Sequence, residues 1–412
     1  MNIRAGIACL AAVVGAIAVW NASPAGADPV VAQAAPAASP APTPTPAPHL
    51  LQVSAYADAG YTSASVASVV GTPGGSQITG RVFDTLNDQI QFHNFNLQAA
   101  YNGPIGGKVE ASFGDDANVI NSYPKGTVAA GTDVDLTQAY AQFQSGAFTV
   151  IAGKFETLAG AEVIESPNNL NFSRSILFGY AVPFTHTGAR ITWALSPTVT
   201  LIAGANRGWD TTRSNPNNGL PQTDTASLTG EAGLAFNPSK VVSLTVQGYD
   251  GQVEEASALA TAGVFTLTPA RPVRTLIDSV LTYHASPALT LVLNGDDGRQ
   301  TNSNIFDSAC NLVGYGTATW SGLAAYANYA INSQWSWTLR GETFGDIGGS
   351  RTGVNQHWEE ATVTLQYSPI SNIIIRGEVR GDHSTTGYFV GSNGGRFSNN
   401  SQFGFEAIAK YP

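Results

Sequence analysis

The segment RITWALSPTVTLIAGANRGW (residues 190–209) contains two short runs on either side of a Ser-Pro-Thr turn. In each run apolar and polar residues alternate, which is the pattern of a strand with one apolar and one polar face. One face carries Ile191, Trp193, Leu195, Val199, Leu201, Ala203 and Ala205, and the other carries Arg190, Thr192, Ala194, Thr198, Thr200, Gly204 and Asn206. The segment therefore predicts a β-hairpin whose apolar face covers either a protein core or lipid.

The composition helps to choose between core and lipid. Charged residues make up only 12% of the 412 residues, about half of the roughly 25% expected of a soluble globular protein. After the first 20 residues no long uninterrupted apolar run occurs. This excludes a bundle of membrane helices, because each helix would need about 20 apolar residues. The formal net charge of −10 argues against nucleic-acid binding, which needs basic patches.

Residues 1–27 have the features of a secretory signal peptide. Arg4 is followed by the apolar stretch AGIACLAAVVGAIAVW, and the AGA sequence that ends at Ala27 provides a small-residue cleavage site. Residues 28–49 are too rich in Pro and Ala to bury a core, so we expect a disordered, polyproline-like periplasmic linker. Contact of this linker with peptidoglycan or a partner is the alternative. Cleavage leaves Cys310 as the only cysteine, so no intrachain disulfide can form.

The alternation recurs from residue 50 to the end of the chain. It is clear in GKVEASFG (107–114), SLTGEAGLAF (227–236), VSLTVQGYDG (242–251), LTLVLNGDD (289–297), WSWTLRGE (335–342) and EATVTLQY (360–367). Such segments have the length of about ten residues that a tilted strand needs to cross a bilayer. Tight turns rich in Pro, Gly, Asn and Ser alternate with long polar connections, as in outer-membrane barrels. We therefore predict that residues 50–412 form an all-β transmembrane antiparallel β-barrel of about 16 strands, with both termini on the periplasmic side.

The aromatic residues favour this barrel over a soluble propeller or β-helix. A soluble protein needs a charged solvent face, whereas the polar faces here carry mainly Thr, Ser, Asn, Gln and Gly, and no regular repeat occurs. Aromatic residues near the predicted strand ends suggest interfacial girdles. They are Trp193, Trp209, Trp320, Trp335, Trp337, Trp358, Tyr283 and Tyr367. For any single Trp, packing against neighbouring residues is an equally good explanation.

Some positions break the alternation. Ile202, Val292 and Ile374 fall on the polar side, which faces the lumen of the predicted barrel. The segment VDLTQAYAQF (134–143) changes phase near Gln138, which predicts a bulge or a segment packed beneath an inward loop. The last segment, SQFGFEAIAKYP (401–412), looks like the closing strand that barrel-assembly machinery binds, although it ends on proline instead of an aromatic residue.

The segment GKFETLAGAEVIESPNNLNFSRSILFGYAVPFTHTGAR (153–190) resembles part of the OmpL-like β-barrel porins. The shared features are a Gly-Lys-Phe strand end, an Asn-rich segment, a Ser-Arg-Ser run followed by hydrophobic residues and Phe, and a Pro…His-Thr-Gly re-entry into the barrel. The strand pattern extends the resemblance over roughly residues 50–412. The resemblance implies an outer-membrane porin with no catalytic residues.

Two groups of charged residues are candidates for the pore constriction. The first belongs to the long connection 156–185, which would narrow the lumen if it folded inward. Within or beside this connection lie Lys154, Glu156, Glu162, Glu165, Arg174 and Arg190. The second group lies on the predicted lumen face of two strands and comprises Arg340, Glu342, Arg376, Glu378 and Arg380.

Charges of the second group belong inside the barrel, because a charge that faces lipid costs roughly 2–4 kcal/mol at the bilayer midplane. There they either contribute to ion selectivity or form a structural ladder that braces the wall. The connection 156–185 could instead face outward, with its charges solvated. The polar sides of other strands also carry Lys108, Glu110, Glu231, Asp278 and Asp296.

Catalytic and metal-binding signatures are weak. The six His residues are scattered, and Asp382-His383-Ser384 is the nearest approach to a catalytic set. Glu359 and Glu360 follow His357, but strand alternation puts the two carboxylates on opposite faces, so no metal site is expected. We therefore expect neither an enzyme nor a cofactor.

The sequence predicts a diffusion porin of a Gram-negative outer membrane, in which small hydrophilic solutes cross a water-filled lumen and are filtered by width and fixed charge. Two other functions stay open: a structural or adhesive barrel with an occluded lumen, and a substrate-specific channel. The expected partners are outer-membrane lipid, the barrel-assembly machinery during biogenesis and the transported solutes, with no nucleic acid. The solute, the ion preference and the oligomeric state, a homotrimer included, are left open.

Overall fold

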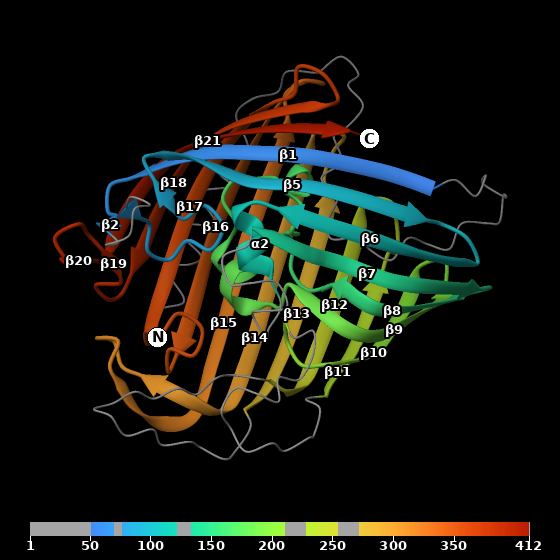
Figure 1. Ribbon diagram of the computed structural model, residues 1–412, viewed down its shortest axis with the longest axis horizontal. Coiled ribbons are helices and arrows are strands. Elements are labelled where there is room, and N and C mark those ends of the chain that lie inside the picture. The colour runs from blue at the N-terminus through green and yellow to red at the C-terminus, as the bar shows by residue number, and fades with distance from the viewer. Residues whose placement is uncertain (1–50, 70–75, 122–132, 211–227, 254–271, 412) are drawn as a thin grey trace.

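The computed structural model describes residues 51–69, 76–121, 133–210, 228–253 and 272–411. The predicted signal peptide and Pro-rich linker lie outside these residues. Within the described part of the chain, no helix is long and apolar enough to cross a membrane. Most of this part is β-strand (Figure 1).

Sixteen antiparallel strands close into a barrel, as the alternation predicts. The order round the barrel is β1-β21-β18-β17-β16-β15-β14-β13-β12-β11-β10-β9-β8-β7-β6-β5. The first eight strands along the chain are β1 (Leu51–Ala64), β5 (Gln89–Tyr101), β6 (Ile105–Phe113), β7 (Val134–Ser145), β8 (Phe148–Glu156), β9 (Thr185–Ser196), β10 (Val199–Asn206) and β11 (Thr229–Phe236). The other eight are β12 (Val242–Gln252), β13 (Val273–His284), β14 (Leu289–Phe306), β15 (Leu312–Ala330), β16 (Trp335–Ile347), β17 (Gln356–Tyr367), β18 (Ile373–Ser384) and β21 (Asn399–Tyr411).

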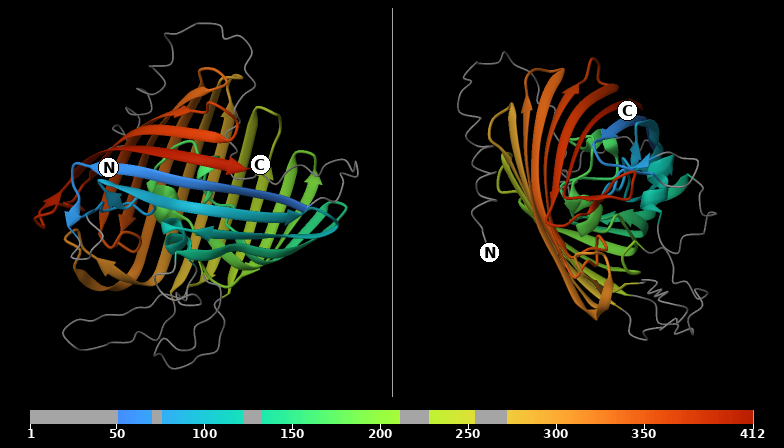
Figure 2. Two further views of the ribbon diagram at one scale, coloured as in Figure 1. Left: turned by 45° about the horizontal axis from the view of Figure 1, so that its top comes forward. Right: turned by 90° about the vertical axis from the view of Figure 1, so that its left-hand side faces the viewer.

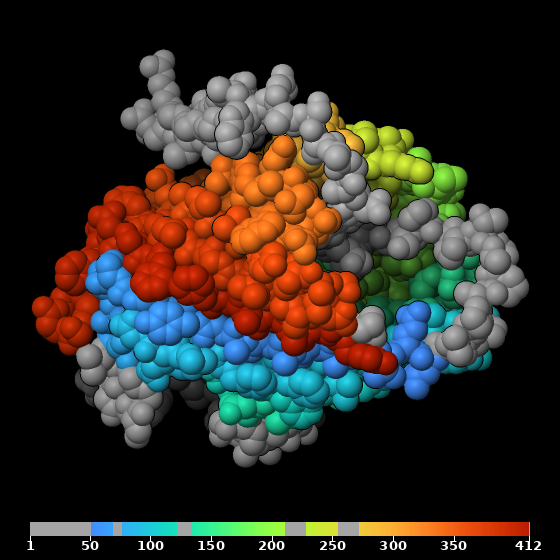
Figure 3. Space-filling view, turned by 90° about the horizontal axis from the view of Figure 1, so that it is seen from above, coloured from blue at the N-terminus to red at the C-terminus, as the bar shows by residue number. Residues whose placement is uncertain are grey.

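The first and last strands close the barrel. Ala55 of β1 lies opposite Tyr411 of β21, and the two strands run antiparallel. Figure 3 shows the red β21 lying along the blue β1 on the outer surface. The chain therefore enters and leaves the barrel at the same rim, as an even number of strands requires.

The hairpin of residues 190–209 forms β9 and β10. Trp193 pairs with Leu201, and both lie on the outer face, where 39% of Trp193 and 37% of Leu201 is exposed. Arg190, on the other face, is buried inside the barrel. The same alternation around the wall produces an outer apolar band, whose exposed members include Phe95, Leu97, Phe143, Leu281, Leu293, Leu323, Val363 and Phe405.

The predicted aromatic girdle is right for five residues and wrong for three. Trp193, Tyr283, Trp335, Trp337 and Tyr367 lie on the outer face near strand ends, and the rings of Trp335 and Tyr367 stack at 4.4 Å. Trp209, Trp320 and Trp358 are instead buried, with 6%, 1% and 0% of their surface exposed. Trp320 and Trp358 occupy inward positions of their strands and belong to an apolar cluster inside the barrel.

The structure confirms the predictions at positions that break the alternation. The register between β6 and β7 shifts next to Glu110 and passes over Thr137, so β7 carries a β-bulge where residues 134–143 change phase. Ile202, Val292 and Ile374 are buried, with 5%, 8% and 5% exposed. Apolar residues on the lumen side of the wall are therefore part of the interior packing.

The long connections carry the remaining elements. These are β2 (Ser68–Val69), β3 (Ser76–Gln77) and β4 (Leu86–Asn87) after β1, α2 (Asp115–Ile120) after β6, the 3-10 turn η2 (Ser166–Asn168) and the π-helical turn η3 (Leu177–Ala181) after β8, and β19 (Phe389–Val390) and β20 (Arg396–Phe397) after β18. The connection between β8 and β9, residues 157–184, lies inside the barrel, between its opposite walls (green in Figures 1 and 2). We call residues 157–184 the inner segment.

Candidate functional site

Two wall carboxylates hold the inner segment by its backbone. Glu342 on β16 and Glu378 on β18 each accept hydrogen bonds from two successive backbone N–H groups. The donors are Phe172 (2.9 Å) and Ser173 (3.1 Å) for Glu378, and Ile176 (2.7 Å) and Leu177 (3.1 Å) for Glu342. Hydrogen bonds to an ionised carboxylate are stronger than those between neutral groups. The middle of the inner segment is thereby fixed against β16 and β18.

Three arginines of the same wall bind the carbonyl groups of the inner segment. The bonds run from Arg340 to Ser173 O (2.6 Å), from Arg376 to Ser166 O (3.1 Å) and Asn169 O (2.5 Å), and from Arg380 to Arg174 O (2.9 Å). Each arginine also pairs with a wall carboxylate: Arg340 with Glu360 (2.9 Å), Arg376 with Glu406 (2.7 Å) and Arg380 with Asp382 (2.7 Å). All three are buried. The arginines and glutamates of β16 and β18 are thus arranged as a ladder that braces the inner segment.

Charged residues of the inner segment complete this network. Glu162 accepts hydrogen bonds from the backbone N–H of Ser175 at 2.7 Å and from Arg340 Nη1 at 2.9 Å. Arg174 turns back onto its own segment, and its guanidinium lies 5.1 Å from the centre of the Phe83 ring. Its hydrogen-bond acceptors are Ile164 O (2.7 Å), Phe172 O (3.2 Å) and Ser166 Oγ (3.2 Å). Glu162 therefore connects the segment to the wall through Arg340, and Arg174 holds parts of the segment's own backbone together.

Further contacts hold the rest of the segment. At its C-terminal end Asp210 accepts hydrogen bonds from the N–H groups of Phe184 (2.7 Å) and Thr185 (3.0 Å). Burial raises the pKa of Asp210, against the effect of these bonds. The other contacts are Tyr249 Oη to Thr157 Oγ1 (3.2 Å), Ala161 N to Asn294 Oδ1 (3.1 Å) and Trp320 Nε1 to Ala181 O (3.1 Å).

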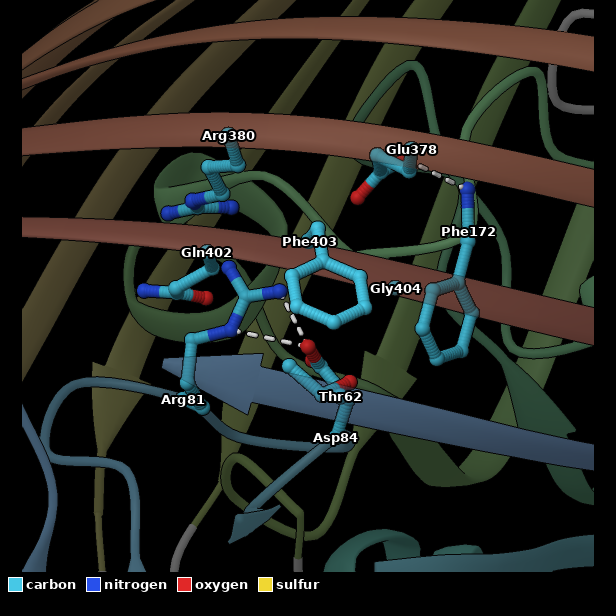
Figure 4. Close-up of a pocket in the computed structure, with 9 residues that line it drawn as sticks. All are labelled: Thr62, Arg81, Asp84, Phe172, Glu378, Arg380, Gln402, Phe403 and Gly404. Carbon is cyan, nitrogen blue, oxygen red and sulfur yellow. Dashed lines mark hydrogen bonds and ion pairs between the residues drawn. The ribbon is translucent and has the colours of Figure 1, made fainter. Parts of the chain in front are cut away.

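Apolar side chains of the inner segment also pack against the barrel wall. Leu177 is fully buried over Gly322 of β15, where a Cβ atom would lie 2.6 Å from Leu177 Cδ1. Phe172 fits against Gly404 of β21, where a Cβ atom would lie 2.8 Å from its ring. Figure 4 shows the ring of Phe172 beside Gly404, with the Phe172 N–H bonded to Glu378. Both glycines make room for side chains of the inner segment.

The wall from β6 to β9 lies on the other side of the inner segment from the ladder. It also carries charged residues, and one of them approaches the inner segment at Glu165. Lys108 Nζ on β6 lies 2.7 Å from Glu110 and 3.8 Å from Glu165 of the inner segment. Carboxylate oxygens of Glu110, Glu156 and Glu165 lie within 4.8 Å of one another. Burial and the Glu110 carboxylate raise the pKa of Glu165, while Lys108 opposes them. We call Lys108, Glu110, Glu156 and Glu165 the acidic contact.

The two basic candidate residues on β8 and β9 are paired with acidic neighbours. Lys154 lies 3.1 Å from Asp135, and Arg190 lies 2.9 Å from Glu231. Of the predicted pore residues, Glu162, Glu165 and Arg174 lie in the inner segment, and the five on β16 and β18 bind it. Lys154, Glu156 and Arg190 lie on β8 and β9, the strands that the inner segment connects. Sequence reasoning missed Glu360 and Glu406, which strand alternation puts on the same face as their arginine partners. It also missed Asp210, which no local pattern marks.

The nearest approach to a catalytic set does not assemble. Asp382 and Ser384 point into the barrel and are buried, whereas His383 is exposed on the outer face. Asp382 pairs with Arg380, and His383 Nδ1 lies 2.9 Å from Asn399 Oδ1. Adjacent residues of a strand face opposite sides, so these three cannot act together.

Comparison with known proteins adds a family and a fold. A family model described as "Putative beta-barrel porin-2, OmpL-like" matches residues 50–411. The search among curated proteins gives no match.

Three similar solved structures are the outer membrane channel DcaP of Acinetobacter baumannii, the trimer form of OmpT of Vibrio cholerae and the anion-selective porin from Comamonas acidovorans. For DcaP the TM-score is 0.56 at 11% identity, with 88% of this chain and 97% of that chain covered. For OmpT the TM-score is 0.55 at 12% identity, with 88% of this chain and 99% of that chain covered. For the Comamonas porin the TM-score is 0.56 at 8% identity, with the same coverage of both chains. At such identities these likenesses show the fold alone.

The family match spans all sixteen strands of the barrel and the inner segment. It confirms the resemblance seen in residues 153–190. The chain therefore belongs to the family of OmpL-like β-barrel porins.

Proposed function

We propose that the protein is a porin through which small hydrophilic solutes and ions diffuse passively across the outer membrane. The observation that carries this proposal is a closed barrel of sixteen strands with an apolar outer band and an inner segment bound to its wall. A barrel of this size is wide enough to leave an aqueous lumen. Membership of a porin family supports a channel in preference to an enzyme.

The inner segment is proposed to narrow the lumen, so that solutes and ions pass on one side of it. Its contacts with the wall extend from β12 through β14, β15, β16 and β18 to β21, and Lys108 of β6 approaches it at Glu165. The route would therefore run between it and the wall from β6 to β9. On this side 17% of the Lys108 side chain and 9% of the Glu165 side chain are exposed, against 0% for Arg340, while Glu110 is buried as deeply as Arg340. Fixed charges at such a constriction filter the solutes that pass.

The proposal extends to assembly and surroundings. Residues 1–27 would direct export, residues 28–49 would form a periplasmic linker, and residues 50–412 would insert into outer-membrane lipid with the help of barrel-assembly machinery. A homotrimer is included, since the solved OmpT structure is described as a trimer form. No cofactor, catalysis or nucleic acid is part of the proposal.

One observation favours a second candidate function, a structural or adhesive barrel with an occluded lumen. Apolar residues of the inner segment and of other long connections pack together inside the barrel. They include Phe83, Ile120, Phe178, Trp209, Val354 and Phe389. If this cluster fills the cross-section, ions will not pass.

Single-channel recording separates the two functions. The chain without residues 1–27 would be refolded, checked for a folded barrel by its heat-dependent mobility in gel electrophoresis, and added to a planar lipid bilayer. We expect stable open steps whose conductance rises with salt, and none from a sample unfolded by heat before addition. A folded barrel without conductance would overturn the porin proposal in favour of the occluded barrel. Saturation and block by one solute would instead indicate a substrate-specific channel.

A further inference from the structure

The arginine ladder is not free to interact with passing ions. The Arg340 side chain is completely buried, lies 2.9 Å from both Glu162 and Glu360, and binds a carbonyl of the inner segment. Arg376 and Arg380 are satisfied in the same way by wall carboxylates and backbone oxygens. The strong positive charges of β16 and β18 are therefore neutralised where they stand.

Two cations on the strands that adjoin Glu156, Lys154 of β8 and Arg190 of β9, are also paired elsewhere. Lys154 is bound to both carboxylate oxygens of Asp135, each at 3.1 Å. Arg190 is paired with Glu231 at 2.9 Å. Arg190 does reach Glu156, but it donates to the backbone oxygen, at 3.2 Å, and not to the carboxylate.

The acidic contact contains three carboxyl groups and one lysine. Its three glutamates have carboxylate oxygens within 4.8 Å of one another. Lys108 lies among them, and the charge of Arg174 also acts on Glu165. Lys108 is closest to Glu110, at 2.7 Å, and is 3.8 Å from Glu165. Independently, the Oε1 atom of Glu156 is buried and accepts no hydrogen bond from the residues that the structure describes.

The acidic contact also lies where the inner segment meets the opposite wall. Glu165 directly precedes η2 in the inner segment, Lys108 and Glu110 come from β6, and Glu156 ends β8. The 3.8 Å approach of Lys108 to Glu165 links the segment to the wall on the side away from the ladder. A solute that follows the proposed route therefore passes beside these groups.

We propose that the acidic contact sets the ion preference of the pore and makes it select small cations over anions. The inference rests on the proposed porin function. Glu156 and Glu165 supply the attraction, Lys108 weakens it, and the ladder determines only the position of the inner segment.

The test is the reversal potential of single channels under a KCl gradient, which gives the ratio of potassium to chloride permeability. We expect a ratio above one. Glu156→Gln and Glu165→Gln should each lower it, and Lys108→Gln should raise it, by roughly two- to fourfold for a charge a few ångströms from the ion in screened water. Glu359→Gln, an exposed change on the outer face, is the matched control and should keep the ratio.

The outcomes distinguish the two proposals. No conductance from the folded barrel would remove the porin function. Open channels that prefer chloride, or variants that all keep the parent ratio, would overturn the cation inference and leave the porin function standing. Shifts of opposite sign for Lys108→Gln and Glu156→Gln would support the inference, since a merely structural role predicts no such reversal. If a glutamine variant fails to fold, Lys108→Arg and Glu156→Asp keep the charge and must keep the ratio.

Discussion

Replacement of Glu378 by alanine should release the middle of the inner segment from the wall. The Glu378 carboxylate accepts hydrogen bonds from Phe172 N at 2.9 Å, Ser173 N at 3.1 Å and Thr364 Oγ1 at 2.7 Å. The residue is only 6% exposed, so water has little access to the groups that it satisfies. Glu378→Ala would leave two backbone N–H groups facing a buried gap.

The size of the effect follows from these bonds. A buried donor that loses its acceptor costs about 1–3 kcal/mol, so two backbone donors cost about 2–6 kcal/mol. Because about 1.4 kcal/mol corresponds to a factor of ten, the detached state of the segment should become roughly 30 to 20,000 times more populated. Glu342 still holds Ile176 and Leu177, so we expect fluctuation of the segment and not unfolding of the barrel.

Single-channel conductance is the assay. Glu378→Ala should give larger and noisier open steps than the parent, and Glu342→Ala/Glu378→Ala should increase both effects. Glu359→Ala, on the outer face of the neighbouring strand, is the matched control and should behave as the parent. If the double variant folds and conducts like the parent, the carboxylates do not hold the segment and the description of the ladder as its brace is wrong.

Three further predictions concern the same interior. Arg376→Met should destabilise the barrel by about 3–5 kcal/mol in urea unfolding from lipid vesicles, because Glu406 stays buried without its partner, and Arg376→Met/Glu406→Met should recover most of the loss. Phe178→Ala should cost about 3–5 kcal/mol in the same measurement, since Phe178 is 2% exposed and packs on Phe83; a loss below about 0.5 kcal/mol, typical of a surface change, would contradict this packing. The selection of cations should weaken as pH falls, because burial and the Glu110 charge raise the pKa of Glu165 and its negative charge is lost as pH falls through that raised value. The charged groups that face Glu165 are Lys108, Glu110, Glu156 and Arg174. Reversal potentials between pH 5 and 8 that do not change would contradict this assignment.

Strand alternation predicts most of the fold, because a barrel wall has one apolar side and one polar side along its whole length. The same rule places Arg340, Glu342 and Glu378 inside without any knowledge of their partners. The rule also warns against a girdle position for Trp358, which shares its side of β17 with Glu360. Aromatic content near a strand end indicates an interface only when the residue also faces outward.

The partners of the inner charges could not be predicted. Glu342 binds the N–H groups of Ile176 and Leu177, and a backbone N–H group has no signature in a sequence. The alternatives left open for the ladder, ion selectivity or a structural brace, differ only in what the charged groups touch. Only the path of the inner segment through the barrel decides between them, and that path depends on contacts with residues more than a hundred positions away, such as the contact of Trp320 with Ala181.

Neither the net charge of the chain nor the number of lumen charges determines what such a pore selects. Arg340 and Arg380 both place a positive charge inside the barrel, yet each has a carboxylate within about hydrogen-bond distance and also binds a backbone oxygen of the inner segment. Their field is cancelled locally, and a solute beyond the inner segment meets little of it. A charge influences permeation when it lacks such a partner and borders the route. By that criterion Glu156 and Glu165 matter more than the whole ladder, and this ranking is what the permeability ratios of their glutamine variants would measure.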